Sequence, residues 1–246
     1  PRPTPELSYA VRELNCVGGI VITASHNPKE YNGYKVYWSD GGQIVPPHDI
    51  AIMEEVRKVD GPAKVKKLVD DQLIEIIGDE VDQKYREAVL AESIHPESIA
   101  DSADMPIVYT SLHGAGITQM PMVLDELGFR NIHIVEEQEK PDGNFPTVHS
   151  PNPEEKAALD LALKLGEKVD ADMVMGTDPD ADRVGIAVKD LEGRLVLLNG
   201  NETASILTYY LLSGLKEKGR LPDNGFVCRT IVTTELIDEI AEAYGV

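Results

Sequence analysis

A strand–helix–strand pattern between residues 106 and 136 constrains the fold of this chain more than any other feature. Pro106–Thr110 is expected to be a strand, and Thr118–Leu127 a helix that ends at Gly128. Asn131–Glu136 is then expected to be the next strand. Because strands joined through a helix normally lie parallel in one sheet, this pattern predicts the α/β class.

Similar blocks recur along the chain, so we expect serial α/β/α domains with mixed, mainly parallel sheets. A helix is expected to be capped by Asn152, with Pro153 as its first residue and acids in its first turn. Further helices are expected at 49–59, capped by Asp49, and at 74–93, 203–218 and 235–244. Further strands are expected at 17–23 (buried), 34–38, 43–45, 172–175, 184–188, 195–198 and 226–231.

Composition limits the classes of partner. The formal net charge of −20 disfavours nucleic acid and anionic membranes, and no apolar run approaches the ~20 residues of a membrane span. Cys16 and Cys228 form no CxxC pair, which fits a reducing cytoplasm. The chain opens at Pro1 without Met and ends at Val246, two residues after an expected helix, so we expect a piece of a longer protein.

The segment Thr23–Pro28 offers a hydroxyl nucleophile, Ser25, on a polar loop. A serine in such a place is more often a turn or capping residue, and its surroundings lack the G-x-S-x-G pattern of a triad hydrolase. His26 and Asn27 add hydrogen-bonding groups beside it. Lys35 lies in an expected strand that can return past the loop, so it is either a base, a phosphate contact or a solvated lysine.

Three carboxylates lie close together at Asp178, Asp180 and Asp182. Two charges about 4 Å apart repel by roughly 4 kcal/mol at a surface-like dielectric, so such a group raises its pKa values or binds a cation. An EF-hand needs Gly at its sixth position and Glu at its twelfth, where this chain has Arg183 and Lys189. Mg²⁺ with phosphate oxygens is the better match, and Arg183 could neutralise a transferring phosphoryl group. A solvated acidic turn, and a phosphatase loop with Asp178 as nucleophile, remain alternatives.

Other motifs carry less information. The glycine-rich segment Thr110–Gly116 lacks the Lys-Ser/Thr of a P-loop, so we interpret it as a structural turn. Four histidines show no spacing typical of metal ligands and are expected on the surface or in loops: His48, His95, His133 and His149.

The serine loop (Thr23–Pro28) and the aspartate loop (Asp178–Arg183) together resemble the α-D-phosphohexomutases. This family includes phosphoglucomutase and phosphomannomutase. The resemblance rests on GGIVITASHNPKEYNGYK at 18–35, DGGQI at 40–44 and GTDPDADRVGIAV at 176–188. TSLHGAG at 110–116 and SPNPEE at 150–155 support it. The amino-acid sequence of residues 31–38 resembles the phosphoglucomutase branch of the family most.

The resemblance implies a Mg²⁺-dependent isomerase that interconverts glucose 1-phosphate and glucose 6-phosphate through a bisphosphorylated sugar, with glucose 1,6-bisphosphate as activator or intermediate. Ser25 matches the family's phosphoserine, and Lys35 matches a lysine proposed as general acid/base. The resemblance also places His26 and Asn27 beside the phosphoserine and Arg183 near it. Mg²⁺ would be held by Ser25 together with the three aspartates: Asp178, Asp180 and Asp182.

The resemblance further implies three domains in this chain: the end of domain 1 at residues 1–76, domain 2 at 77–191 and the start of domain 3 at 192–246. We expect a hexose phosphate substrate, no nucleic acid or membrane partner, a cytoplasmic location, and no mutase turnover by this chain alone. The alternatives are phosphomannomutase, phosphopentomutase or glucose-bisphosphate-related activity, or a non-catalytic fragment that binds sugar phosphates.

Overall fold

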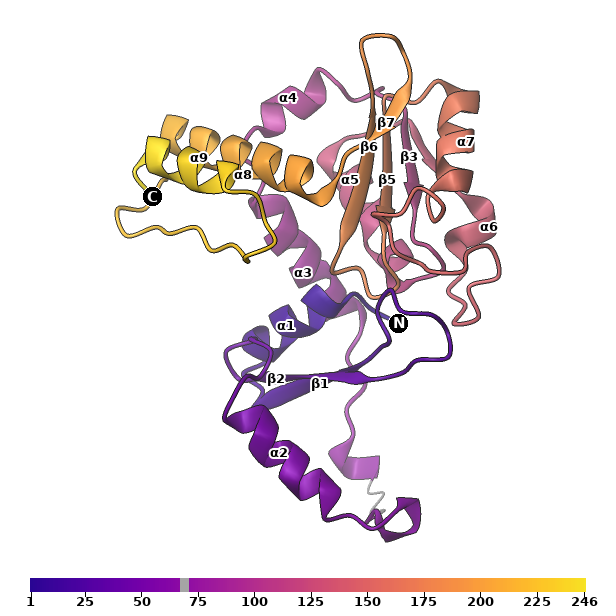
Figure 1. Ribbon diagram of the computed structural model, residues 1–246, viewed down its shortest axis with the longest axis vertical. Helices are drawn as coiled ribbons and strands as arrows, with labels where there is room; N and C mark the ends of the chain where they lie inside the picture. Colours follow the sequence, from indigo (N-terminus) through magenta and orange to yellow (C-terminus); the bar gives the residue numbers. More distant parts are fainter. Residues whose placement is uncertain (67–70) are drawn as a thin grey trace.

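The computed structural model describes residues 1–66 and 71–246, and it confirms the α/β class (Figure 1). The helices are α1 (Thr4–Glu13), α2 (His48–Arg57), α3 (Asp79–Ala91), α4 (Pro96–Ala100), α5 (Met120–Leu127), α6 (Glu136–Glu139), α7 (Asp160–Val169), α8 (Gly200–Glu217) and α9 (Leu236–Tyr244). The strands are β1 (Gly18–Ile22), β2 (Tyr34–Trp38), β3 (Ile107–Thr110), β4 (Ile132–Ile134), β5 (Met173–Thr177), β6 (Val184–Lys189) and β7 (Leu195–Leu197). Short 3-10 helices cover Pro62–Lys64, Asp71–Leu73 and Ala115–Thr118.

A five-stranded mixed sheet forms the centre of the larger unit, in the order β4-β3-β5-β6-β7. Strand β3 is parallel to both β4 and β5, whereas β5–β6 and β6–β7 are antiparallel. The antiparallel pairs follow from short connections: loop 178–183 is too short for the crossover that a parallel pair requires. The strand–helix–strand prediction is therefore confirmed as β3-α5-β4.

Helices cover both faces of this sheet (Figure 1). The crossover from β3 to β4 and the crossover from β4 to β5 run in opposite directions along the sheet, so right-handed connections put α5 and α7 on opposite faces. Helix α7 packs against β3 and β5. The buried core on this side consists of Val108, Val135, Leu159, Ala162, Leu163, Ala171, Val174 and Ala187.

A smaller hairpin unit contains α1, β1, β2 and α2 (Figure 1). Strands β1 and β2 are antiparallel, and α1 packs against both β1 and α3. The prediction that β1 is buried is wrong, because Ile20 is 62% and Ile22 78% exposed. These side chains alternate with Gly19, which lies under Val11 of α1, so only one face of the strand is covered within the described residues.

The helix expected from Asn152 begins later, at Asp160. Asn152 accepts a hydrogen bond from the Glu154 amide at 3.3 Å, which makes a turn rather than a helix cap. The segment then crosses the sheet: the Pro153 carbonyl would lie 1.9 Å from a Cβ at Gly185, so only glycine leaves room there. The residues that predicted a helix cap therefore belong to a turn that packs over the sheet through Pro153.

Three further predictions differ from the structure. Residues 226–231 form no strand, because no neighbouring strand in the described chain pairs with them, and Ile231 is 97% exposed. Helix α2 has Pro47 as its cap instead of Asp49. The expected strand at 43–45 is reduced to a single bridge between Gln43 and Tyr37.

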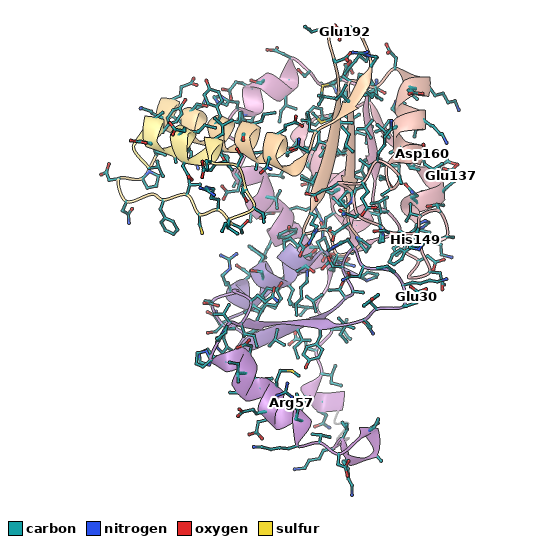
Figure 2. The ribbon with its side chains drawn as sticks, in the orientation of Figure 1. Glu30, Arg57, Glu137, His149, Asp160 and Glu192 are labelled. Atoms are coloured by element: carbon teal, nitrogen blue, oxygen red, sulfur yellow. The ribbon has the colours of Figure 1, made fainter. Side chains whose placement is uncertain are left out.

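The surface carries much of the negative charge. Figure 2 shows the acidic side chains of Glu137, Asp160 and Glu192 at the outside of the larger unit, and all three are exposed. No helix within the described residues combines the length and the apolar character needed to cross a membrane.

Candidate active site between the serine and aspartate loops

The aspartate loop begins where β5 ends, next to the carboxyl end of β3. The connection after β3 leads to β4, whereas the connection after β5 leads to β6 on the other side. Open α/β sheets usually bind ligands where the connections reverse direction in this way. The Ala115 amide donates to the Pro179 carbonyl at 2.7 Å. A Cβ at Gly114 would lie 2.3 Å from Pro179 Cα, so this glycine permits the close approach. The glycine-rich segment that follows β3 therefore supports the aspartate loop.

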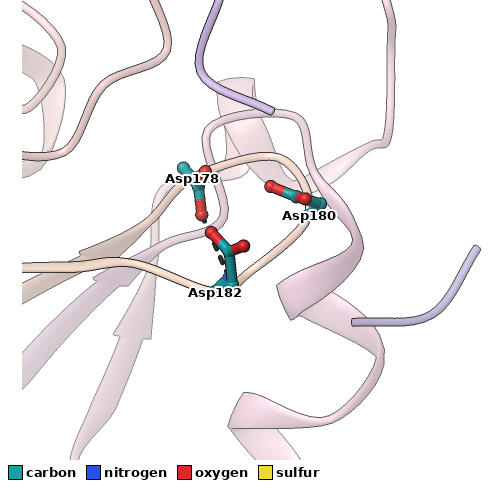
Figure 3. Close-up of side chains that lie close together, drawn as sticks. All are labelled: Asp178, Asp180 and Asp182. Carbon is teal, nitrogen blue, oxygen red and sulfur yellow. Dashed lines mark hydrogen bonds between the residues drawn. The ribbon is translucent and has the colours of Figure 1, made fainter. Parts of the chain in front are cut away.

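The three aspartates converge (Figure 3). One carboxylate oxygen from each can be chosen so that all lie within 4.8 Å of one another. Asp178 and Asp180 are buried and Asp182 is exposed. Asp178 Oδ1 accepts from the amides of Asp182 at 3.2 Å and Arg183 at 3.1 Å, which fixes the start of the loop against its end.

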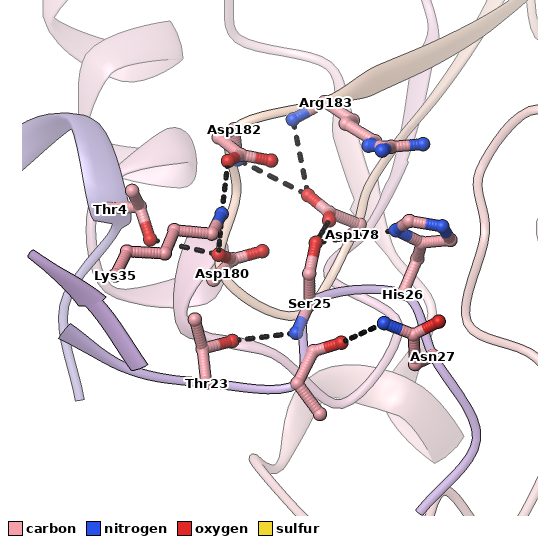
Figure 4. Close-up of polar contacts among 11 residues, drawn as sticks. Thr4, Thr23, Ser25, His26, Asn27, Lys35, Asp178, Asp180, Asp182 and Arg183 are labelled. Carbon is pink, nitrogen blue, oxygen red and sulfur yellow. Dashed lines mark hydrogen bonds and ion pairs between the residues drawn. The ribbon is translucent and has the colours of Figure 1, made fainter. Parts of the chain in front are cut away.

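The serine loop reaches this cluster from the hairpin unit (Figure 4). Ser25 follows β1 and has φ of 52°, a left-handed conformation that is uncommon for a residue other than glycine. Its amide donates to Thr23 Oγ1 at 2.8 Å, which stabilises the turn. Its Oγ donates to Asp178 Oδ2 at 2.8 Å, and His26 Nδ1 lies 3.3 Å from the same Oγ. The two loops, 153 residues apart, thus meet at the serine hydroxyl.

Lys35 joins the cluster from β2. It pairs with Val21 across the hairpin, and its Nζ donates to Asp180 Oδ2 at 2.7 Å and to Asp182 Oδ2 at 2.5 Å. A single ammonium group therefore compensates two of the three carboxylates.

The electrostatic environments of these groups differ. Burial, followed by repulsion from Asp180, raises the pKa of Asp178 to about 7, although the Ser25 hydrogen bond opposes that change. Burial also disfavours ionised Asp180, but hydrogen bonds led by Lys35 outweigh it and lower its pKa. Burial opposes the charge on Lys35, yet bonds to Asp180 and Asp182 raise its pKa. Protein contacts thus compensate Asp180 but leave Asp178 in need of a positive charge.

Two predicted site residues lie in the loops without turning their side chains to the cluster. The Asn27 side chain donates to the Ala24 carbonyl at 2.9 Å and so stabilises its own loop. Arg183 contributes its backbone amide to Asp178, while its exposed guanidinium extends away from that carboxylate (Figure 4).

Sequence reasoning missed Thr4. Its side chain is buried and donates to Asp180 Oδ2 at 2.9 Å. The available signal was local: Thr4 precedes Pro5 and Glu6, and proline with an acid in a first turn is typical of a helix start.

The residues present suit a hard divalent cation. Asp180 Oδ1 is buried and has no hydrogen-bond partner in the part of the chain that the structure describes. Such an atom is costly unless it is satisfied. Oxygen ligands with open positions are typical of Mg²⁺ that also contacts phosphate. The three aspartates could hold this ion, with the Ser25 hydroxyl next to it.

Two family models match this chain over most of its length. The model described as phosphoglucomutase/phosphomannomutase, alpha/beta/alpha domain I, matches residues 1–62, and the model of alpha/beta/alpha domain II matches residues 83–193. The chain belongs to the phosphoglucomutase/phosphomannomutase family. The first match contains the serine loop of this chain, and the second contains its aspartate loop.

Curated relatives agree with this assignment. A phosphoglucomutase from Staphylococcus haemolyticus is 36% identical over 100% of this chain, and one from Staphylococcus aureus is 37% identical over 98%. The chain spans 44% and 43% of the length of these relatives. A crystal structure described as a phosphomannomutase from Thermus thermophilus has a TM-score of 0.76 at 28% identity, and the match covers 100% of this chain and 51% of that one.

Proposed function

We propose that this chain carries the phosphoryl-transfer centre of a Mg²⁺-dependent phosphohexomutase that interconverts glucose 1-phosphate and glucose 6-phosphate. One observation carries the proposal: Ser25 Oγ donates to Asp178 Oδ2 at 2.8 Å, which places a nucleophile beside a carboxylate cluster suited to a cation. The curated relatives with the name phosphoglucomutase support glucose as the sugar.

Ser25 would act as the phosphoryl acceptor and donor. When a sugar bisphosphate phosphorylates it, a bond forms between Oγ and phosphorus while the bond from phosphorus to the sugar oxygen breaks. The serine proton would pass to Asp178 Oδ2, to which the hydroxyl already donates. The Lys35 ammonium could give a proton to the leaving sugar oxygen and take one in the reverse step. In this proposal His26 orients the serine hydroxyl and the Arg183 amide fixes Asp178.

The cation would be held by Asp178, Asp180 and Asp182, with the Ser25 oxygen or its phosphate beside them. When bound, Mg²⁺ would offset the negative charge that spreads over the phosphoryl oxygens during transfer. The chain's own contribution is to fix the carboxylates: backbone amides hold Asp178, and Lys35 holds the other two.

The test is transfer of a phosphoryl group to Ser25. Incubation of the chain with glucose 1,6-bisphosphate and Mg²⁺, followed by intact-mass measurement and peptide mapping, should find phosphate on Ser25. Ser25→Ala should take up none, whereas Ser213→Ala, which removes a half-buried hydroxyl of α8, should match the wild type. An acid-labile acyl phosphate on Asp178 would instead indicate an aspartate-nucleophile phosphatase.

A mannose phosphate is the second candidate substrate, because the Thermus structure is described as a phosphomannomutase. The same measurement with mannose 1,6-bisphosphate compares the two sugars. Faster labelling of Ser25 by the mannose compound would reverse the order that we propose.

The remaining expectations belong to this proposal. We propose domain boundaries near residues 76 and 191, supported by family-model matches that cover 1–62 and 83–193. We expect no mutase turnover by this chain alone, since it spans 44% of a relative's length. Glucose 6-phosphate formed from glucose 1-phosphate by the purified chain would contradict that. A cytoplasmic location is supported by free Cys16 and Cys228.

A further inference from the structure

Thr4 makes two contacts with Asp180, a residue 176 positions away in the sequence. Thr4 is the first residue of α1, so its amide has no partner inside the helix. That amide donates to the Asp180 carbonyl at 2.7 Å, and Thr4 Oγ1 donates to Asp180 Oδ2 at 2.9 Å. The side chain is enclosed, since Thr4 is only 3% exposed. One residue therefore holds both the main chain and the carboxylate of Asp180.

Thr4 itself is held rigidly. Pro3 and Pro5 flank it, and their rings restrict the backbone on both sides. Glu6, in the first turn of the same helix, is buried and accepts from Gln119 Nε2 at 3.0 Å, which ties α1 to the helix-start region of α5. The hydroxyl is thus delivered from a fixed position.

The two oxygens of Asp180 have different surroundings. Oδ2 accepts from Thr4 Oγ1 and from Lys35 Nζ at 2.7 Å. Oδ1 is buried and has no partner within residues 1–66 and 71–246. Two donors on one oxygen stop the carboxylate from rotating about its Cβ–Cγ bond, and they leave the other oxygen as a ligand.

We propose that Thr4 is a positioning residue for the metal site: its hydroxyl holds Oδ2 of Asp180 so that Oδ1 faces the divalent cation. The proposal rests on the proposed function, which places a cation among the three aspartates. Partners that orient metal ligands commonly change metal affinity about 10- to 100-fold when they are removed.

A purely structural clip between α1 and the aspartate loop would behave differently. It would lower the stability of the fold in the absence of metal, but the folded protein would bind the cation as before. Cation affinity therefore separates the two roles, and activity is not needed as a readout.

The experiment titrates Mn²⁺ into the chain and follows the free ion by electron paramagnetic resonance. Thr4→Val keeps the shape of the side chain and removes the donor, so it should weaken Mn²⁺ binding about 10- to 100-fold. Thr4→Ser keeps the hydroxyl and should bind within about threefold of the wild type. Ser8→Ala is the matched control, because it removes another hydroxyl of α1, one that donates to the Gly41 carbonyl at 2.6 Å. It should bind Mn²⁺ like the wild type.

Asp180→Asn separates failure of this role from failure of the metal site. If Asp180→Asn abolishes binding while Thr4→Val binds like the wild type, the positioning role is overturned and the metal site stands. If the wild-type chain binds no Mn²⁺, the metal site of the proposed function fails and the role of Thr4 fails with it. Circular dichroism checks that each variant is folded. Should Thr4→Val not fold, Thr4→Cys offers a weaker donor of similar size, and it must bind Mn²⁺ more weakly than Thr4→Ser.

Discussion

At the scale of single residues, the site depends on one lysine ammonium group that compensates the charges of two carboxylates. Lys35 Nζ contacts both Asp180 and Asp182, and each of these contacts raises the pKa of the lysine. The same group is the candidate acid that protonates the leaving sugar oxygen. Charge compensation and proton transfer can be separated by substitution, because arginine keeps the first and cannot perform the second.

We predict that Lys35→Met and Lys35→Arg both slow phosphorylation of Ser25 by about 10²- to 10⁴-fold, the usual contribution of a general acid. The measurement is the rate of phosphate incorporation from glucose 1,6-bisphosphate. Lys58→Met, at the exposed end of α2, is the control and should leave the rate unchanged. A Lys35→Arg chain as fast as the wild type would show that Lys35 acts only through its charge.

Sequence reasoning identified the residues whose chemistry is local in the chain. Sequence reasoning could find the three aspartates because carboxylates spaced so closely in one loop repel one another unless a positive charge compensates them. These are Asp178, Asp180 and Asp182. Ser25 drew attention as a hydroxyl on a polar loop, and the structure brings it to the aspartates. The role of Thr4 could not be found in this way, because its contact spans 176 residues and depends on how α1 docks.

At the scale of elements, the aspartate loop keeps its shape because the segment after β3 packs directly beneath it. Gly114 allows that approach, since a Cβ there would lie 2.3 Å from Pro179 Cα. Backbone atoms of the loop cannot move aside as a flexible side chain would. An added methyl group must therefore displace the loop.

We predict that Gly114→Ala lowers the free energy of unfolding by about 1–3 kcal/mol, the usual cost of overpacking. Urea unfolding measures this change, and Mn²⁺ titration should show weaker binding as the aspartates shift. Gly143→Ala is the matched control, because no heavy atom lies within 4 Å of its added Cβ. Equal unfolding free energies for the two variants would mean that the segment after β3 does not constrain the loop.

Elements whose apolar residues repeat with a clear helix or strand period were predictable from the sequence. Elements whose conformation depends on tertiary packing were not. The β3-α5-β4 unit follows from local patterning alone. The cap signal at Asn152 failed because the turn after it packs over the sheet through Pro153 and Leu159, which are both buried. The expected strand at 226–231 failed because a strand forms only beside a partner, and apolar composition does not supply one.

At the scale of the whole molecule, the hairpin unit and the sheet unit meet through a carboxyl pair. Burial, followed by contact with Asp82, raises the pKa of Glu6 to about 7. Arg2 binds Asp82 through two hydrogen bonds, at 2.7 and 2.6 Å, and these lower the pKa of Asp82. Glu6 on α1 and Asp82 on α3 thus interact across the contact between these two helices, and Glu6 is the carboxyl whose pKa is raised.

This pair predicts a pH dependence of stability. The folded-state pKa of Glu6, about 7, lies above its ordinary value of 4.5, so between these pH values the folded state holds a proton that the unfolded state has lost. Stability should therefore fall as pH rises through this window, with a contribution of up to about 1.4 kcal/mol per pH unit. Glu6→Gln should remove that part of the slope.

Urea unfolding at pH 5, 6 and 7 tests this expectation. Glu54→Gln, an exposed change on α2, is the control and should keep the wild-type slope. A Glu6→Gln slope identical to the wild type would show that the carboxyl pair does not retain its proton in the folded state.

The distance in sequence between Ser25 and Asp178 also has a consequence in time. Chains are synthesised at about 5–20 residues per second, so the 153 positions that separate these residues take roughly 8 to 30 s to emerge. Throughout that interval Ser25 exists on a growing chain without the three aspartates. Under the proposed function, a growing chain could therefore not begin to accept phosphate on Ser25 until β5 and the loop after it have been synthesised.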